Sequence, residues 1–427
     1  MSRRRRVVVT GLGMVTPLGI RVEETWEGLL SGASAIEPIH LFNAEGLPVS
    51  GAGQLSDRHW NEIRARFAHE ARAEGERRTL FALAAAESAL EDSKLFQPPP
   101  NPWRAGLSLA AGVGLCRLED IARWTDRDGA FDLHAFAREL DRVRPESPIR
   151  NPADRPNRLI AQRFLLRGPN LTITAACAAA TQAIGLAFQR IRRGAADVML
   201  AGGADSMVSE MGIVSFLLLG AASTASKPPS ELCRPFDRAR GGLVVGEGAG
   251  VVVLEEESHA RRRGARIYAE VAGYGSSIDA FRVTAPHPQG RGAIRAMQAA
   301  LRDAEMAPSE IDYINAHGTG TKLNDPIETA AIKAVFGERA RRVPISSTKS
   351  MIGHLMAAAG GPEFIVTVLS VERDQVHPTR NLTAPDPKCD LDYVPHARRL
   401  SVRAALSNSF GFGGQNASIT VKKYREA

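Results

Sequence analysis

The feature that most constrains this chain is an apolar run that leads directly into small residues and then into a helix-forming segment. It reads Leu171-Thr-Ile-Thr-Ala-Ala-Cys-Ala-Ala-Ala-Thr-Gln-Ala-Ile-Gly185. The pattern predicts a strand, a tight corner and a helix, with Cys177 at the corner. A thiol placed there faces unpaired backbone N–H groups and the positive end of a helix dipole, which favours the thiolate. The segment therefore predicts an α/β chain with a nucleophilic cysteine.

Two later segments each place a histidine beside a glycine after an apolar run. They read Tyr313-Ile-Asn-Ala-His-Gly-Thr-Gly-Thr321 and Ser346-Ser-Thr-Lys-Ser-Met-Ile-Gly-His-Leu-Met-Ala-Ala-Ala-Gly360. A cysteine among alanines is by itself more often a small buried side chain, and a single histidine is more often a surface or core residue. A cysteine at a corner together with His317 and His354 indicates a catalytic site instead.

These residue types suit the joining of two acyl groups. A cysteine thiolate is both a nucleophile and a good leaving group, so Cys177 can carry an acyl group as a thioester. A carbanion forms at neutral pH when a malonyl thioester loses CO₂, provided that the developing enolate oxygen meets hydrogen-bond donors. The Nε2–H groups of neutral His317 and His354 can be those donors.

The order of the predicted elements indicates α/β layers and an internal duplication. Strand-like runs alternate with amphipathic helices such as Arg77 to Asp92. Later segments repeat the roles of earlier ones, because the helix after Cys177 parallels the helix after His354. The strand-like runs are Val7 to Thr10, Leu171 to Thr174, Val198 to Ala201 and Val251 to Leu254. We expect two related halves that divide near residue 262.

Composition and missing motifs exclude several classes of protein. The 427 residues include four cysteines and carry a formal net charge of +7. There is no G-x-S-x-G motif, which a serine hydrolase needs, and no H-E-x-x-H or C-x-x-C motif, which would indicate a zinc site. The segment Gly11-Leu-Gly-Met-Val-Thr16 lacks the third glycine of a dinucleotide fingerprint. No run approaches the ~20 apolar residues of a membrane helix. We expect a cytoplasmic protein that has an acidic partner and binds neither membrane nor nucleic acid.

The three segments above and four others closely resemble the β-ketoacyl-acyl-carrier-protein synthases, the decarboxylating condensing enzymes. The four are Val7-Val-Val-Thr-Gly-Leu-Gly-Met-Val-Thr-Pro-Leu-Gly19, Ala196-Asp-Val-Met-Leu-Ala-Gly-Gly-Ala204, Gly246-Glu-Gly-Ala-Gly250 and Asn408-Ser-Phe-Gly-Phe-Gly-Gly414. The resemblance covers about residues 6–423 and is weakest between 116 and 160. It implies a thiolase-like fold with duplicated halves, 1–262 and 263–427, in αβαβα layers. It also implies a dimer, substrates carried on phosphopantetheine by acyl carrier protein, and no further cofactor.

The resemblance assigns roles to individual residues of this sequence. It implies that the backbone N–H groups of Cys177 and Phe412 form the oxyanion hole, with Phe412 also acting as a gate and Phe410 beside it. Lys349 is expected to orient the histidines and to hold charge near Glu328. The resemblance also implies pantetheine binding by Thr319 and Thr321 and an acyl pocket at Val113 and Phe216. The positive net charge, by contrast, makes Arg77 and Arg78, and the run Arg261 to Arg263, candidate contacts for docking an acidic carrier. Asn315, Glu363, Ser407 and Asn408 match positions that hold a monovalent cation in some relatives.

Alternative functions remain open at this point. The segment around Gly320, followed by Asp-Pro-Ile-Glu328, resembles polyketide or polyene ketosynthases, which can pair with a chain-length subunit, whereas Asn408 to Gly414 resembles the long-chain fatty-acid type. A biosynthetic thiolase acting on coenzyme A esters would need a second cysteine near the C-terminus, and Phe410 to Gly414 contains none. A carrier-binding scaffold without catalysis would not need Cys177 and the two histidines.

Overall fold

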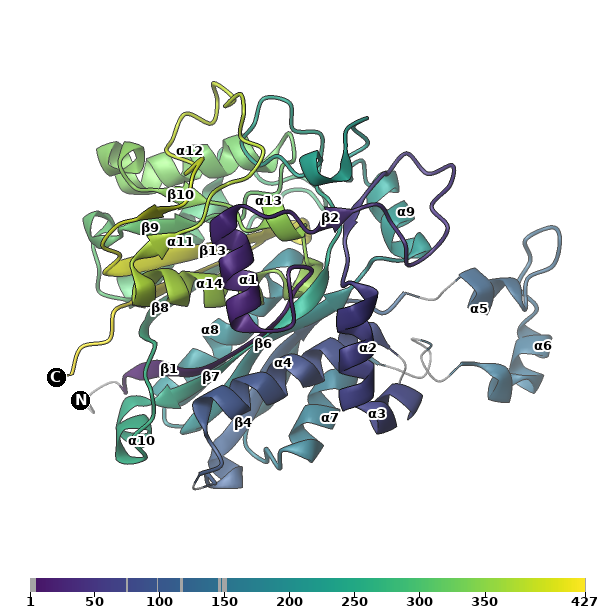
Figure 1. Ribbon diagram of the computed structural model, residues 1–427, viewed down its shortest axis with the longest axis horizontal. Coiled ribbons are helices and arrows are strands. Elements are labelled where there is room, and N and C mark those ends of the chain that lie inside the picture. The colour runs from purple at the N-terminus through teal and green to yellow at the C-terminus, as the bar shows by residue number, and fades with distance from the viewer. Residues whose placement is uncertain are drawn as a thin grey trace.

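One ten-stranded sheet forms the frame of the molecule (Figure 1). The computed structural model describes residues 5–73, 76–97, 99–115, 118–144, 147 and 152–426. In spatial order the strands are β10 (Ile345–Ser346), β9 (Tyr313–Asn315), β13 (Ala404–Gly411), β14 (Gln415–Lys422), β8 (Ala269–Ile278), β1 (Val7–Val15), β7 (Glu247–Glu256), β6 (Val198–Ser206), β4 (Ala105–Ala111) and β5 (Asn170–Ile173).

The sheet consists of two halves with the same internal order. In the first half, β7 runs antiparallel to β1 and β6, and the pairs β6–β4 and β4–β5 are parallel. In the second half, β14 runs antiparallel to β8 and β13, and the pairs β13–β9 and β9–β10 are parallel. The halves meet where β1 pairs with β8, from Val7 opposite Val271 to Val9 opposite Ala269. The predicted duplication is therefore confirmed.

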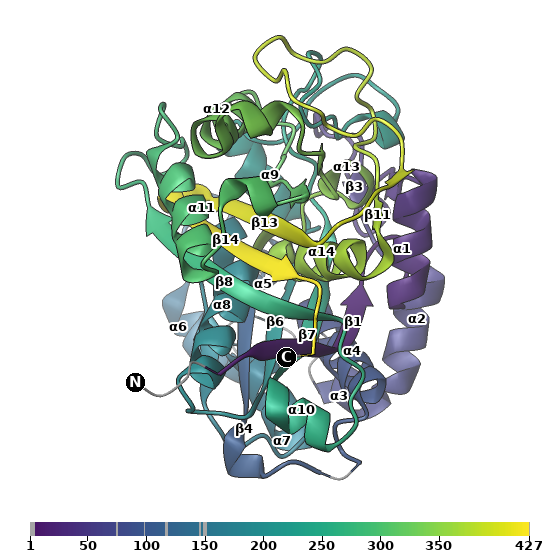
Figure 2. The ribbon, with the colours of Figure 1, turned by 90° about the vertical axis from the view of Figure 1, so that its left-hand side faces the viewer.

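Helices complete the predicted layers. The central pair α8 (Ala179–Arg192) and α14 (Gly360–Arg373) pack against each other and against strands of both halves (Figure 2). One outer layer contains α4 (Arg77–Ser93) and α7 (Arg155–Arg163), and the other contains α11 (Arg291–Asp303) and α12 (Asn324–Phe336). Both central helices must be apolar on several faces, and α14 is buried along nearly its whole length.

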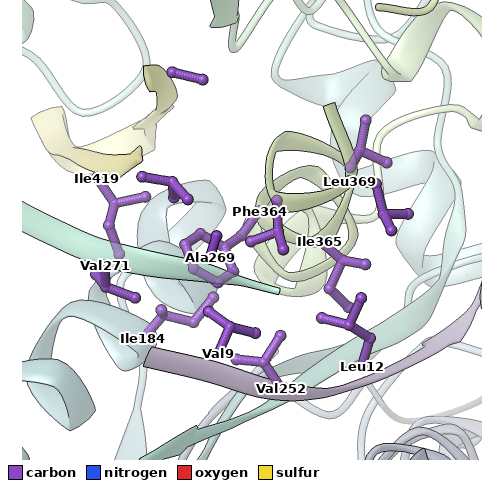
Figure 3. Close-up of a cluster of buried hydrophobic side chains, with 14 of the residues drawn as sticks. Val9, Leu12, Ile184, Val252, Ala269, Val271, Phe364, Ile365, Leu369 and Ile419 are labelled. Carbon is purple, nitrogen blue, oxygen red and sulfur yellow. The ribbon is translucent and has the colours of Figure 1, made fainter. Parts of the chain in front are cut away.

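The main hydrophobic core lies between the central helices and strands of both halves (Figure 3). Ile184 of α8 and Phe364 of α14 both belong to it, and together with strands from either half they tie the two halves into one body. Strand and helix residues labelled in Figure 3 are Val9, Leu12, Ile184, Val252, Ala269, Val271, Phe364, Ile365, Leu369 and Ile419. Burial of such a continuous apolar core fixes the relative positions of the two central helices.

Shorter elements surround this frame. They are α1 (Val22–Ser31), α2 (Asp57–Arg66), α3 (Ala68–Ala73), α9 (Glu210–Leu218), α10 (Glu257–Arg262), α13 (Lys349–Ile352) and the strand pairs β2 (Ile36–Glu37) with β3 (Ala52–Gly53) and β11 (Gln375–Val376) with β12 (Arg398–Arg399). In the described part of the chain, no helix combines the length and apolarity needed to cross a bilayer.

An arm projects from the body where no family motif could be placed (Figure 1). It carries α5 (Leu118–Ala122) and α6 (Leu133–Arg138), and the rings of Trp124 and Phe136 meet edge to face inside it. Within 116–160, residues 116, 117, 145, 146 and 148–151 lie outside the described part.

Candidate active site

Cys177 lies at the predicted corner between β5 and α8. The turn η3 (Ala176–Ala178) makes the corner, and Ala176 has a φ of 46°. A non-glycine residue in this left-handed region is strained, so the surrounding packing must hold it there. A hydrogen bond of 2.8 Å between the hydroxyls of Thr181 and Ser409 ties the first turn of α8 to β13. The thiol is buried, with 8% of the residue exposed.

His317 lies in the loop after β9, where a buried carboxylate fixes the backbone. Glu328 of α12 accepts hydrogen bonds from the backbone N–H groups of His317 and Gly318, both at 2.8 Å. Lys349 donates to the carbonyl oxygen of His317 at 2.7 Å and approaches its Nδ1 at 3.3 Å. Because an ammonium group only donates, Nδ1 of His317 accepts and Nε2 carries the proton.

His354 lies just before a second corner that leads into α14. The backbone N–H of Met356 donates to Nδ1 of His354 at 3.1 Å, so Nε2 again carries the proton. Nε2 of His354 is buried and has no hydrogen-bond partner among the described residues. It is therefore free to donate to a group that enters the cavity.

The structure brings Cys177, His317 and His354 together in one cavity. Ligand-type atoms of the three side chains lie within 4.8 Å of one another. The two imidazole rings are 5.5 Å apart between centroids at 83°. All three residues line a cavity of about 420 Å³, which Thr319, Thr321, Phe410 and Phe412 also line.

A cysteine and two histidines at this spacing are also a donor set for a soft metal ion. Zinc would need an unprotonated nitrogen from each imidazole. Both Nδ1 atoms are already acceptors, from Met356 and Lys349, and both Nε2 atoms carry protons. The hydrogen bonds thus set both rings as donors into the cavity and do not fit a metal site.

Burial controls the protonation of the site. Burial lowers the pKa of both His317 and His354 well below 6.5, and the positive charge of Lys349 lowers each further, so both are neutral at pH 7. Burial raises the pKa of Cys177 to about 11, although Lys349 and a hydrogen bond from the backbone N–H of Phe412 act in the opposite direction. The expectation that the corner favours the thiolate is therefore wrong for the resting site, because desolvation outweighs the favourable interactions.

The residues expected to support the histidines are close by, and the charge of Lys349 acts on Glu328, where it opposes the rise in pKa that burial causes. Lys349 forms its ion pair with Glu363 of α14, whereas Glu328 accepts the backbone N–H groups of the His317 loop. Phe410 packs against His317, with ring centroids 5.9 Å apart. The hydroxyls of Thr319 and Thr321 lie 3.0 Å apart in the cavity wall.

The two residues expected in the acyl pocket do not line the cavity of this single chain. Phe216 of α9 and Met356 are buried in one hydrophobic cluster, and Phe412 packs against that cluster. Phe412 lines the cavity, whereas Phe216 does not. Val113 lies beyond the end of β4, where the chain leaves the sheet, and is 63% exposed. The apolar lining of the cavity includes Leu217, Leu219 and Val283 instead.

The expected carrier-docking role of Arg77 and Arg78 is wrong, because both side chains point inward. Arg77 pairs with the buried carboxylate of Glu247 through a hydrogen bond of 2.8 Å and stacks on the ring of Trp60 at 4.2 Å. Arg78 is 3% exposed and donates to the carbonyl oxygen of Gly112. Their adjacent positions at the start of α4 look like a surface patch in sequence, but aromatic and acidic partners from distant segments bury them.

The four residues expected at a cation site lie in one buried region. Asn315 of β9 and Ser407 of β13 are direct partners in the sheet. Oδ1 of Asn315, Oε2 of Glu363 and Oγ of Ser407 are buried without a hydrogen-bond partner in the described part of the chain. Asn408 is already engaged, because its Oδ1 accepts from Ser418 at 2.8 Å. Three unpaired oxygens fit a hard monovalent cation better than a transition metal.

Comparisons with known proteins identify the family. Residues 4–260 match the family model "Beta-ketoacyl synthase, N-terminal domain" and residues 268–383 match "Beta-ketoacyl synthase, C-terminal domain". The chain belongs to the β-ketoacyl synthase family. Curated relatives named 3-oxoacyl-[acyl-carrier-protein] synthase 2 include one from Synechocystis sp., 41% identical over 99% of both chains, and one from Coxiella burnetii, 38% identical over 98% of this chain and 99% of the relative.

Two solved ketosynthase structures share this fold. A type II polyketide ketosynthase, solved in complex with its acyl-carrier protein, is 34% identical with a TM-score of 0.88 over 99% of this chain and 100% of that one. The ishigamide ketosynthase/chain length factor is 36% identical with a TM-score of 0.85 and the same coverage. The thiolase-like fold is therefore established.

Proposed function

We propose that this chain is a 3-oxoacyl-acyl-carrier-protein synthase that elongates acyl chains by decarboxylative condensation. The observation that carries the proposal is the convergence of one buried thiol and two imidazoles whose Nε2–H groups point into the same cavity. A thiol with two neutral donors suits thioester exchange followed by enolate formation.

The first half-reaction loads the enzyme. The sulfur of Cys177 attacks the carbonyl carbon of an acyl thioester, and the backbone N–H groups of Cys177 and Phe412 stabilise the oxyanion. The carbon–sulfur bond to the carrier breaks, and the thiol proton passes to the leaving carrier sulfur. The acyl group is then a thioester on Cys177.

The second half-reaction forms the carbon–carbon bond. A malonyl thioester loses CO₂, and the electron pair becomes an enolate whose oxygen accepts hydrogen bonds from Nε2–H of His317 and His354. The enolate carbon attacks the acyl carbonyl, and the intermediate expels the Cys177 thiolate, which takes a proton from water. Lys349 keeps His317 in the donating tautomer.

A product assay tests the proposal. The protein is incubated with an acyl carrier thioester and malonyl-carrier, and the carrier products are separated by mass. We expect a 3-oxoacyl carrier and CO₂ in equal amounts. Formation of an elongated product from an acetyl thioester in place of malonyl, without CO₂, would indicate a thiolase reaction instead.

Fatty-acid elongation is the pathway favoured by the curated relatives at 38–41% identity. A polyketide or polyene pathway is the second candidate, because the two ketosynthase structures above match over 99% of this chain. A ladder of acyl primers separates them, since a fatty-acid enzyme accepts saturated chains and a polyketide enzyme prefers oxidised or unsaturated ones.

Neutral histidines lead to a prediction about pH. Since both pKa values lie well below 6.5, decarboxylation of malonyl-carrier should show no histidine step between pH 8 and pH 6. Burial raises the pKa of Glu363 to about 7 and that of Asp205 to about 6, so a step in this range would belong to one of these two carboxyl groups. Initial rates of CO₂ release across the range check this, and a step that survives both Glu363→Gln and Asp205→Asn would contradict neutral histidines.

The rim of the cavity is the surface that we propose for carrier docking. Lys322 lines the opening and Arg282 lies beside Val283, which also lines it; both cations are exposed, as are the apolar neighbours Val283 and Leu323. An apolar rim with positive charge fits an acidic carrier.

Salt should weaken this docking, because fields between exposed charges are screened beyond about 10 Å at 0.1 M salt. We expect the KM for acyl-carrier to rise with salt and with Lys322→Glu plus Arg282→Glu, while turnover of pantetheine thioesters changes little. The charge-matched control is Arg261→Glu plus Arg262→Glu on α10. This helix lies at the opposite end of the molecule from α9, whose Leu217 lines the cavity (Figure 1). Equal effects of both pairs, or on both substrate classes, would remove the rim from docking.

Four further points belong to the proposal. A homodimer through β5 is supported by the outer edge of this strand, which pairs with no further strand in the described part of the chain, and the mass in solution checks it. A monovalent cation is supported by the three unpaired oxygens, and stabilisation by K⁺ or Na⁺ in thermal unfolding checks it.

A division of the chain after Arg262 is supported by the end of α10 there, and tolerance of an insertion after Gly264 checks it. A reducing cytoplasm is supported by the free Cys177, Cys233 and Cys389, and imaging of a tagged chain checks it.

A further inference from the structure

The corner after His354 repeats the corner that carries Cys177. Met356 has a φ of 46°, the same as Ala176, and each residue opens a short turn that leads into a central helix. The turn η7 (Met356–Ala358) packs against β6, and the turn η3 packs against β13. Each half of the sheet therefore covers the corner that belongs to the other half.

What covers the two corners differs. At the first corner, Gly411 leaves no side chain, and a Cβ there would come within 3.0 Å of the backbone nitrogen of Cys177. At the second corner, the end of β6 presents Asp205. Its Oδ2 accepts a hydrogen bond of 2.9 Å from the backbone N–H of Ala357. The first corner stays open for a substrate oxyanion, and the second is closed by a carboxylate.

We propose that Asp205 is a positioning residue that holds the second corner, and through it holds His354 as an Nε2–H donor. The proposal rests on the proposed function, because it assigns His354 to the enolate. The connection is short: Asp205 accepts from Ala357, and the preceding residue, Met356, donates to Nδ1 of His354 at 3.1 Å. The left-handed backbone conformation is unfavourable for a methionine, so a hydrogen-bond partner must hold the backbone of Met356 in place.

The surroundings of Asp205 are built to keep the carboxylate in place. A Cβ on Gly112 would lie 2.3 Å from Oδ2, so only glycine leaves room. Oδ1 accepts from the backbone N–H of Ser206 at 2.9 Å. The guanidinium of Arg78 binds the carbonyl oxygen of Gly112 and supplies a nearby positive charge. Burial raises the pKa of Asp205 to about 6, so it is mainly ionised at neutral pH.

The experiment compares two steps that share the cavity. Decarboxylation of malonyl-carrier depends on the histidines, and acylation of Cys177 depends on the first corner. For Asp205→Ala we expect decarboxylation to fall by about 10²-fold, the scale of a small misplacement of a catalytic group, with little change in Cys177 acylation. Asp205→Asn keeps an oxygen that can accept from Ala357 and should recover most of the decarboxylation. Gly112→Ala displaces the carboxylate and should behave like Asp205→Ala.

A buried carboxylate elsewhere provides the matched control. Asp312 accepts from the backbone N–H of Arg403 at 2.9 Å at the start of β9, outside the cavity lining. Asp312→Ala should lower the unfolding temperature and slow neither step selectively. Imidazole ¹⁵N chemical shifts give a second readout, because wild type should show the Nε2–H form of His354 and Asp205→Ala should lose it.

Two results would overturn the proposal. One is an equal loss of acylation and decarboxylation in Asp205→Ala, in proportion to lost folded protein. The other is an unchanged tautomer and decarboxylation rate in a folded Asp205→Ala. A wild-type protein that acylates Cys177 but never decarboxylates malonyl-carrier would contradict the proposed function itself, whereas the tautomer comparison would still judge Asp205.

Discussion

Cys177→Ala is expected to abolish condensation while decarboxylation of malonyl-carrier continues. The acyl group needs the sulfur, but the enolate needs only the donors of His317 and His354. The carrier substrates are incubated with wild type and variant, and the 3-oxoacyl carrier and CO₂ are measured separately.

The matched control uses another buried thiol. Cys233 is buried and free but does not line the cavity, so Cys233→Ala should keep both reactions. Product formation by Cys177→Ala would remove this thiol from its role, and loss of CO₂ release in the same variant would link the thiol to decarboxylation.

His317→Ala and His354→Ala should each slow decarboxylation by about 10²–10³-fold, the usual effect of losing one oxyanion donor. Acylation of Cys177 should suffer much less, because its oxyanion is assigned to backbone N–H groups. Rates of CO₂ release and of Cys177 acylation are measured on the same preparations.

A third buried histidine separates catalysis from folding. His377 is fully buried, with its Nε2 3.1 Å from the hydroxyl of Thr348, and does not line the cavity. His377→Ala should lower the unfolding temperature and leave decarboxylation per folded molecule near wild type. A variant of His317 or His354 that loses acylation and keeps decarboxylation would reverse the assigned roles.

The sequence could predict the fold and the central residues for definite physical reasons. The run from Leu171 to Gly185 changes from strand-like to helix-like within a few small residues, and that change requires a corner at Cys177. The glycines beside His317 and His354 mark loops that follow buried elements. Repetition of these signals in the same order made the duplicated halves predictable.

Long-range side-chain partners were not predictable in the same way. The adjacent arginines at 77 and 78 look exposed in sequence, and only the tertiary positions of Glu247, Trp60 and Gly112 explain their burial. Lys349 likewise pairs with Glu363 because α14 places that carboxylate beside it in the folded chain.

Backbone contacts were missed for a related reason. The N–H of Met356 that sets the His354 tautomer, and the carboxylate of Asp205 that holds Ala357, carry no sequence pattern. One weak signal was present, since Asp205 is the penultimate residue of a strand, Val198–Ser206, that is otherwise composed of apolar and small residues.

Intact-protein mass spectrometry can follow the acyl group on Cys177 through both half-reactions. The enzyme is incubated with a ladder of acyl carrier thioesters, mapped by proteolysis, and then given malonyl-carrier. We expect an acyl mass on Cys177 alone, which leaves the enzyme when malonyl-carrier is added and reappears on the carrier as the 3-oxoacyl product. An acyl mass on another residue, or an acyl-Cys177 that persists while product forms, would contradict it.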